Sequence, residues 1–150
     1  MEFIEIVFDS PMYQAELELR NSILRAPLGL ALSVEDLKNE ELQLHFGIVE
    51  SDTLLACLVI KPIDQSQVRL RQMAVAKTHQ GKGLGSLLVS QTESMLRARG
   101  FNEVLLHARQ TAIGFYQHLG YSISGELFTE IGIPHINMNK AIFSPARLID

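Results

Sequence analysis

With 150 residues, the chain has the length of one ordinary domain, and its 47% hydrophobic and 20% charged residues exclude a disordered protein. The formal net charge of −4 argues against a nucleic-acid partner, because general nucleic-acid binders are basic. The longest apolar run, residues 54–60, is too short to span a bilayer, and the acidic start of the chain is unlike a targeting peptide, so a cytoplasmic protein with no membrane partner is expected.

The first part of the chain predicts a strand followed by two helices. Residues 2–8 alternate between polar and apolar side chains, as in a half-buried strand. A Ser-Pro pair at 10–11 fits the N-cap and the first residue of a helix, and a Pro-x-Gly string at 27–29 fits its end. Residues 33–36 resemble a capping box and predict a short second helix.

The remainder predicts a sheet with one crossover. Strand-like and helix-like runs alternate in the order strands 42–50, 53–60 and 67–76, helix 84–99, strand 103–108, helix 111–119, and strands 121–128 and 136–142. The strand–helix–strand order between 67 and 108 implies one parallel crossover. The fold class is therefore α/β (α+β), with a mixed, mostly antiparallel central sheet flanked by helices on both faces.

Positive charge is concentrated in one stretch of the sequence. Between Asp64 and Glu93 there is no acidic residue, and the stretch contains four cations: Arg69, Arg71, Lys77 and Lys82. The rest of the chain has 13 − 4 = 9 cations against 17 acids, a charge of −8. A local positive field in an acidic protein suits a small anionic ligand, although pairing of these cations with acids from elsewhere explains the pattern equally well.

A glycine-rich turn lies between the third strand and the long helix. It reads Gln80-Gly81-Lys82-Gly83-Leu84-Gly85-Ser86. Closely spaced glycines allow positive φ and a close approach of the backbone to a ligand, and N–H groups at a helix start can bind phosphate oxygens. The spacing is neither that of a P-loop nor that of the dinucleotide fingerprint. A tight strand–helix connection without a ligand is the alternative interpretation.

Two strings together resemble the GNAT family of N-acetyltransferases. They are Gln80-x-x-Gly83-x-Gly85 after the strand 71–75, and Ala112-x-x-Phe115-Tyr116-x-x-x-Gly120-Tyr121. They occur in the family's order and at about its distance, and the flanking strings 24–29 and 132–135 resemble a bacterial subgroup. The resemblance implies a single acetyltransferase domain over 1–150, in which 1–41 form a strand and variable acceptor-side helices and 42–142 form the cofactor-binding sheet.

The resemblance also implies acetyl-CoA as the acetyl donor. The turn 80–86 would hold its pyrophosphate. Met73, Ala74 and Val75, on a bulged strand, would pair with the pantetheine arm as an added strand would. Phe115 is implied beside the cofactor. Arg109 is placed there as well, although many members have an asparagine at this position.

Tyr116 is implied as the acid that protonates the leaving CoA thiolate, since a phenol with a pKa near 10 stays protonated at neutral pH. Some members place a basic glutamate early in the strand that precedes the glycine-rich turn. This chain has Arg69 there, and arginine cannot deprotonate an amine. Glu130 and His135, which bracket a turn, and His107 on a strand are the candidate bases. No metal is expected, because the five histidines lack ligand-like spacing.

The implied function is direct acetyl transfer to a primary amine of a small molecule or peptide. The sequence leaves the oligomeric state open, and a homodimer is one candidate. An acyl-CoA sensor that has lost the chemistry and a nucleotide-binding protein are the alternatives. Cys57, inside an apolar strand, is expected in the core. Arg20 and Arg25 are expected on a solvated helix face, with contact to an acidic acceptor as the alternative.

Overall fold

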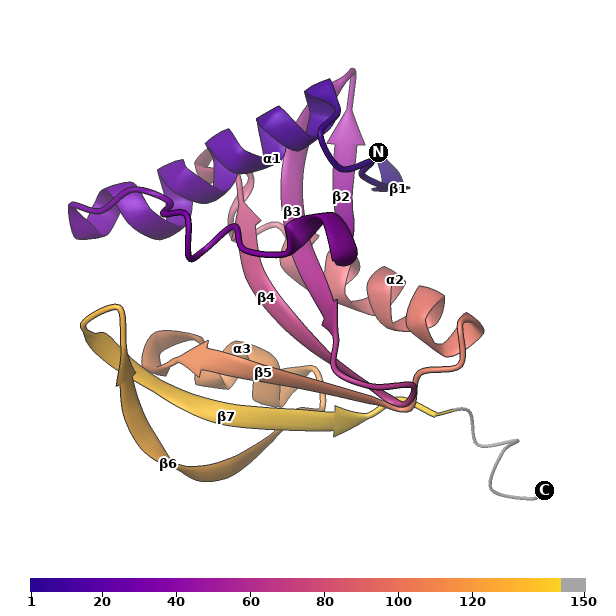
Figure 1. Ribbon diagram of the computed structural model, residues 1–150, viewed down its shortest axis with the longest axis vertical. Helices are drawn as coiled ribbons and strands as arrows, with labels where there is room; N and C mark the ends of the chain where they lie inside the picture. The colour runs from indigo at the N-terminus through magenta and orange to yellow at the C-terminus, as the bar shows by residue number, and fades with distance from the viewer. Residues whose placement is uncertain (144–150) are drawn as a thin grey trace. The chain divides into compact units, whose positions relative to one another are not determined.

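Seven strands form one sheet in the computed structural model, which describes residues 1–143 (Figure 1). Their order is β1-β2-β3-β4-β5-β7-β6. The strands are β1 Glu2–Glu5, β2 Leu44–Glu50, β3 Thr53–Pro62, β4 Gln67–Val75, β5 Glu103–Arg109, β6 Ser122–Glu130 and β7 Ile133–Ala141. Strands β4 and β5 are parallel, whereas β1–β2, β2–β3, β5–β7 and β6–β7 are antiparallel. The expected mixed sheet with one parallel crossover is confirmed.

Within residues 1–143, three α-helices and several short helical turns connect the strands. They are α1 Pro11–Arg20, a π-helical turn η1 Asn21–Arg25, 3₁₀ turns η2 Ala26–Leu28, η3 Glu40–Leu42, η4 Lys77–His79 and η5 Gln110–Ala112, and the helices α2 Leu84–Ala98 and α3 Ile113–His118. Among residues 1–143, no helix has both the length and the apolar character needed to cross a membrane.

Contacts between residues group the chain into two units, which are described separately. The first consists of Met1–Lys61 and Arg71–Glu93, and the second of Pro62–Leu70 and Ser94–Asp150. Strand β4 and helix α2 each contribute residues to both units. Residues 144–150, the end of the expected domain, lie outside the described residues, and the single-domain organisation stays a prediction.

The core of the first unit lies between α1 and the strands. Buried Ile6, Tyr13, Leu54, Cys57 and Ala74 form a cluster against which apolar residues of α1 pack. Figure 1 shows α1 in front of β2 and β3 and α2 behind them, so helices cover both faces here. Cys57 is completely buried, as expected, and burial in apolar surroundings raises the pKa of its thiol. A raised pKa keeps this sulfur as an unreactive thiol.

Local sequence signals explain where α1 begins and ends. The Ser10 hydroxyl accepts a hydrogen bond of 3.2 Å from the Tyr13 N–H, and Pro11 is the first helical residue. At the other end, Gly29 has a left-handed φ of 71° and ends the helical turns. The N-cap and the glycine stop are confirmed as predicted, with a π-helical and a 3₁₀ turn in between.

The predicted second helix is wrong, although its capping box forms. The Ser33 N–H donates to Asp36 Oδ2 at 2.9 Å and the Asp36 N–H donates to Ser33 Oγ at 3.1 Å. Turns follow instead of a helix, and Asn39 has a left-handed φ of 61° that leads into η3. The box therefore caps a series of turns rather than a helix.

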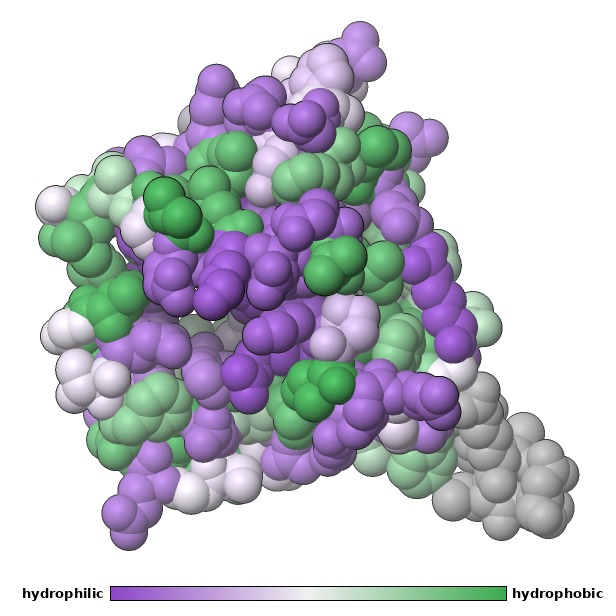
Figure 2. All heavy atoms as spheres, viewed as in Figure 1, coloured by the Kyte–Doolittle hydropathy of each residue, from purple (hydrophilic) through white to green (hydrophobic). Residues whose placement is uncertain are grey.

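In the second unit, β5 separates a buried face from a partly open one. Its residues alternate in burial, with Val104, Leu106 and Ala108 buried and Leu105 and His107 half-buried. Strand β6 is exposed along most of its length. Hydrophilic and hydrophobic residues are interspersed on the face shown in Figure 2.

Candidate active site

The glycine-rich turn adopts a conformation that requires glycine at two positions. Gly81 and Gly83 have φ values of 76° and 81°, and a Cβ at either would meet nothing within 4 Å. Backbone conformation, rather than space, is therefore the constraint. Gly85 is the second residue of α2 and is not among the positive-φ residues. Gln80 closes the turn by donating a hydrogen bond of 3.0 Å to the Val75 carbonyl at the end of β4.

The turn is open on its outer side. Residues 80–83 are exposed, including Lys82, whereas Leu84 is buried and anchors the start of α2. An exposed turn with a lysine before a helix of 15 residues can bind an anion through its N–H groups and the helix dipole. The geometry therefore fits the pyrophosphate site that the resemblance implies.

Strand β4 carries an irregularity next to residues 73–75, where the resemblance implies a bulged strand. Gln72 has a φ of 55°, in the left-handed region, between Arg71 and the predicted pantetheine-pairing residues 73–75. Its side-chain oxygen accepts a hydrogen bond of 3.2 Å from Arg20 Nε. A non-glycine residue in this region is strained, so the surrounding contacts must hold it. Of the predicted residues, Ala74 is buried and Met73 and Val75 are half-buried.

Arg20 lies inside the first unit, which corrects the expectation of a solvated helix face. It is completely buried and donates to both oxygens of Glu40, at 2.8 and 2.6 Å, and to Glu16 at 2.8 Å. The Tyr13 hydroxyl donates to Glu40 at 2.6 Å. Arg71 reaches the same carboxylate at 2.7 Å. The preference for solvent was wrong because a buried carboxylate, 20 residues further along, pairs with this cation.

Arg25 is also not solvated. It is 6% exposed and forms an ion pair of 2.9 Å with Asp36. Burial would raise the pKa of the Asp36 carboxyl, but hydrogen bonds from Arg25 and Ser33 hold it below its ordinary value. Both arginines of the first helical segment therefore stabilise the fold of the first unit, and neither offers a free charge to an acceptor.

The buried network fixes the protonation of its members. Burial would raise the pKa of Glu40, but hydrogen bonds and charge from Arg20, with further bonds from Tyr13 and Arg71, lower it to about 2. His45 Nδ1 lies 2.9 Å from Glu16 Oε2, and its Nε2 lies 2.9 Å from the Glu40 carbonyl. Burial would lower the pKa of this histidine, but the hydrogen bond to Glu16 raises it. Since both ring nitrogens face acceptors, the geometry favours the imidazolium.

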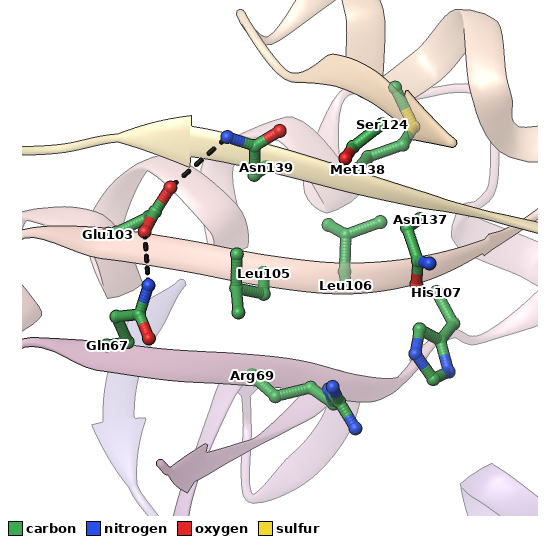
Figure 3. A pocket seen from close by; sticks show the side chains of 10 residues that line it. All are labelled: Gln67, Arg69, Glu103, Leu105, Leu106, His107, Ser124, Asn137, Met138 and Asn139. Atoms are coloured by element: carbon green, nitrogen blue, oxygen red, sulfur yellow. Dashed lines mark hydrogen bonds between the residues drawn. The ribbon is translucent and has the colours of Figure 1, made fainter. Parts of the chain in front are cut away.

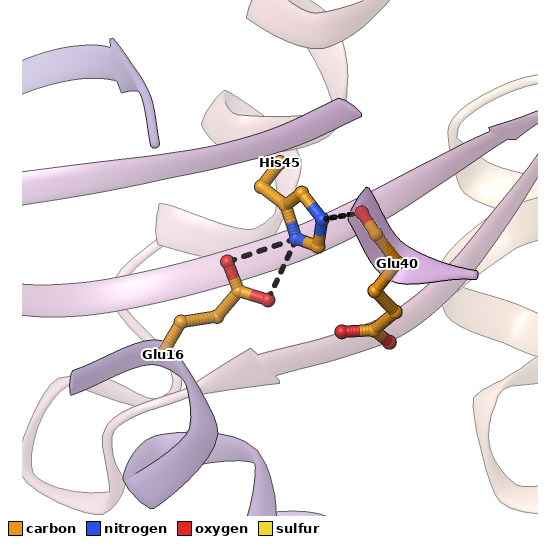
Figure 4. Close-up of side chains that lie close together, drawn as sticks. All are labelled: Glu16, Glu40 and His45. Carbon is orange, nitrogen blue, oxygen red and sulfur yellow. Dashed lines mark hydrogen bonds and ion pairs between the residues drawn. The ribbon is translucent and has the colours of Figure 1, made fainter. Parts of the chain in front are cut away.

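Three members of this network could in principle hold a metal ion. One ligand atom each of Glu16, Glu40 and His45 lies within 4.8 Å of the others (Figure 4). The sequence could not reveal this cluster, because its residues come from α1, η3 and β2. Arg20 already donates to both carboxylates, so their negative charge is balanced by a guanidinium where a metal would bind. The chemistry of this arrangement is that of a buried ion-pair network.

Tyr116, the predicted acid, is buried in α3 of the second unit. It is 7% exposed, and its ring packs edge-on against Phe115 and Tyr121 with centroid distances of 5.0 and 5.6 Å. Burial raises the pKa of its hydroxyl, so the phenol is protonated at neutral pH and can donate a hydrogen bond. This environment fits both a general acid and an aromatic packing residue.

The three candidate bases lie together in the second unit. His107 Nδ1 is 3.2 Å from Glu130 Oε1, and His135 Nε2 is 3.5 Å from Glu130 Oε2. His135 Nδ1 lies 3.0 Å from the Ile133 carbonyl, which fixes the ring. Arg109 is opposite His135 in the β5–β7 register. The carboxylate of Glu130 thus bridges two histidines that the sequence had marked independently.

A cavity of about 400 Å³ opens beside this cluster in the second unit. It is lined by Gln67, Arg69, Glu103, Leu105, Leu106, His107, Ser124, Asn137, Met138 and Asn139 (Figure 3). At one end, Glu103 accepts hydrogen bonds from Gln67 at 2.5 Å and from Asn139 at 3.2 Å. Figure 3 shows the Arg69 side chain pointing away from Glu103 and toward the end where His107 lies.

Curated relatives match about half of the chain in sequence. The uncharacterized protein YyaT of Bacillus subtilis (strain 168) is 40% identical over 74 residues, covering 49% of this chain and 50% of YyaT. The uncharacterized N-acetyltransferase YjcF of the same organism is 32% identical over 73 residues, covering 48% and 52%. The chain spans about half the length of the curated relatives it matches.

Solved structures match almost the whole chain. A candidate N-acetyltransferase from Lactobacillus plantarum has a TM-score of 0.84 at 25% identity, covering 95% of this chain and 98% of that one. An aminoglycoside 6'-N-acetyltransferase complexed with coenzyme A has a TM-score of 0.75 at 21% identity, covering 96% and 98%, and supports the fold alone. A family model described as the acetyltransferase (GNAT) domain matches residues 32–142, well over half of the chain. This match, together with the glycine-rich turn and the mixed sheet, shows that the chain belongs to the GNAT family of acetyltransferases.

Proposed function

We propose that this protein transfers an acetyl group from acetyl-CoA to a primary amine of a small molecule or peptide. The observation that carries the proposal is the conformation of the glycine-rich turn. Gly81 and Gly83 hold left-handed angles immediately before α2, and the turn is exposed. Membership of the GNAT family supports acetyl-CoA as the ligand, and the aminoglycoside enzyme with the same fold binds coenzyme A.

The donor is expected to bind along the turn and the end of β4. Backbone N–H groups of 80–86 and the positive end of α2 would bind the pyrophosphate, with Lys82 adding charge. Residues 73–75 would pair with the pantetheine amides, as in strand addition. Phe115 and Arg109 are proposed as further cofactor contacts, on the resemblance alone.

The chemistry proposed is a direct transfer. The amine nitrogen attacks the thioester carbonyl, the new C–N bond forms as the C–S bond breaks, and the CoA thiolate takes a proton from Tyr116. The proton lost by the amine passes to the cluster of His107, Glu130 and His135, whose carboxylate is partly exposed. General acid–base assistance of this kind contributes about 10²–10⁴-fold.

An acyl-CoA sensor is the second candidate function, because Arg69 stands where some family members have a basic glutamate. The cluster around Glu130 favours the enzyme, because a sensor has no need for a carboxylate bridged to two histidines. A nucleotide-binding protein finds no support in the glycine spacing. A cytoplasmic location and a homodimer stay predictions.

Calorimetric titration with acetyl-CoA, CoA and ATP, followed by CoA release with a panel of amines, tests the proposal. Binding of acetyl-CoA with turnover supports the enzyme, and binding without turnover of any amine supports the sensor. Gly83→Val should weaken binding of acetyl-CoA by at least tenfold while the protein stays folded. The matched control is Gly29→Val, since Gly29 has a similar φ of 71° and equal free space. Binding that survives Gly83→Val unchanged would remove the pyrophosphate assignment.

A further inference from the structure

Arg69 is a cation for which the described part of the chain provides no partner. Arg20, Arg25 and Arg71 each pair with a carboxylate. Within residues 1–143, by contrast, the Arg69 guanidinium forms no ion pair, and its Nε is shielded from solvent without a hydrogen-bond partner. A shielded donor without an acceptor is costly, and in native structures such groups call for an explanation. Arg69 lines the cavity of the second unit, so a ligand placed there would supply the missing acceptor.

The other side chains of the cavity do not neutralise Arg69. Glu103 is the acid among them, and both of its oxygens are occupied by the amides of Gln67 and Asn139. Figure 3 shows this carboxylate at the opposite end of the cavity from the guanidinium. His107 turns its Nδ1 to Glu130. The cavity therefore has a positive charge at the Arg69 end that no lining carboxylate neutralises.

We propose that this cavity binds the carboxylate of the acceptor, so that the protein acetylates small amines that carry a carboxylate. This inference rests on the proposed acetyl transfer and adds the substrate class. A guanidinium presents a planar fork of donors that matches a carboxylate, with two parallel hydrogen bonds. The carboxylate would bind Arg69, and the amine would extend toward His107 and Glu130, which are linked to the same end of the cavity.

The size and charge of the cavity favour a monoanionic group on a small molecule. Its volume of about 400 Å³ lies at the lower end of the range for small-molecule sites. A phosphate ester would bring up to two charges to a cavity that offers one permanent cation and one acid among its lining residues. A carboxylate is balanced by Arg69 alone. Asn137 and Ser124 add neutral hydrogen-bonding groups to the lining.

The test compares amines that differ only in the carboxylate. Straight-chain ω-amino acids with two to five methylene groups and their carboxamides are supplied as acceptors. At least one chain length should show a kcat/KM at least tenfold higher for the acid than for its amide. Arg69→Gln should remove this preference, and Arg69→Lys should restore part of it. The charge-matched control is Lys61→Gln, because Lys61 is exposed on β3 in the first unit and should leave the preference unchanged.

Acetyl-CoA affinity, measured on the same variants, separates a failure of the proposed acetyl transfer from a failure of the proposed carboxylate site. If the wild-type protein does not bind acetyl-CoA, the proposed function fails. Binding of the same acids and amides to the CoA-saturated protein, followed by NMR shifts, tests the cavity without turnover. A tenfold preference for the acid that Arg69→Gln removes supports the inference even when no amine reacts. Equal binding and turnover of acids and amides, a preference that persists in Arg69→Gln, or an equal loss in Lys61→Gln overturns it.

Discussion

The buried guanidinium of Arg20 on α1 donates a hydrogen bond to the side chain of Gln72, the β4 residue whose φ is 55°. The same guanidinium binds Glu16 and Glu40. One cation therefore connects the first helix to the strained position that precedes the proposed pantetheine-pairing residues. The buried network is thus part of what holds β4 in the shape that the proposed donor site requires.

Arg20→Ala should lower the free energy of unfolding by about 3–5 kcal/mol, because it leaves two buried carboxylates without their shared partner. Urea unfolding measures the change. The control is Glu18→Ala on the exposed side of the same helix, which should change stability by less than about 0.5 kcal/mol. Equal effects of the two substitutions would show that the network contributes nothing beyond helix propensity.

Stability should fall in acid because of Glu40. Its carboxyl has a pKa of about 2 in the folded protein against an ordinary 4.5. A lowered folded-state pKa stabilises above pH 4.5, and this contribution of about 3 kcal/mol is lost as the pH falls from 4.5 to 2. Urea unfolding between pH 2 and 7 measures it. Glu40→Gln should be less stable at pH 7 and should show a shallower loss across this window.

Stability should also fall as the pH rises, because of His45. The pKa of its ring is raised in the folded protein by Glu16. A raised pKa stabilises fully below the ordinary value of 6.5, and the contribution disappears as the pH rises through the folded-state pKa. NMR titration of the ring in wild-type protein locates that pKa. A folded-state value below 6.5 would contradict the assignment of an imidazolium here.

Tyr116→Phe separates acid catalysis from packing. The substitution keeps the ring between Phe115 and Tyr121 and removes the hydroxyl alone. If Tyr116 protonates the thiolate, kcat should fall about 10²–10³-fold while acetyl-CoA affinity and melting temperature stay near wild type. Tyr121→Phe is the matched control, since it removes a hydroxyl from a neighbouring buried ring. An unchanged kcat, with chemistry shown to limit the rate, returns Tyr116 to a packing role.

Glu130→Gln should lower turnover most at the acidic end of the pH profile. Without a base, the reaction depends on the fraction of amine that is already neutral, and this fraction falls with pH. Acetyl-CoA affinity should hardly change. Glu126→Gln, an exposed position on the same strand, serves as the control. His135→Gln should show the same pH signature if the histidine orients the carboxylate, and wild-type rates across pH would exclude both residues as the base.

Local signals and element order predicted most of the fold but gave a helix after the Ser33 box where turns form, and they did not reveal the buried side-chain network. The Ser10 cap and the Gly29 stop depend on residues close in sequence, and the parallel crossover follows from the order of strand, helix and strand; all three were predicted. The network of Glu16, Glu40 and His45 joins three elements, so no spacing rule reveals it.

The acid-free stretch of the sequence combines both interpretations offered for it. Arg71 pairs with Glu40, an acid from outside the stretch, in agreement with the interpretation that these cations pair with acids elsewhere in the chain. Arg69 does not pair within the described residues, and Lys82 is exposed on the glycine-rich turn. Charge counting could not distinguish these cations, because burial and partner choice are decided by the fold around each side chain.

The unequal exposure of the Glu130 cluster bears on how a catalytic cycle would end. The Glu130 side chain is 44% exposed, whereas that of His135 is 4% exposed. A base that takes a proton in every cycle has to return it to bulk water before the next acceptor arrives. An exposed carboxylate discharges that proton directly, while its buried histidine neighbour keeps it oriented. The proposed base therefore needs no separate exit route for protons.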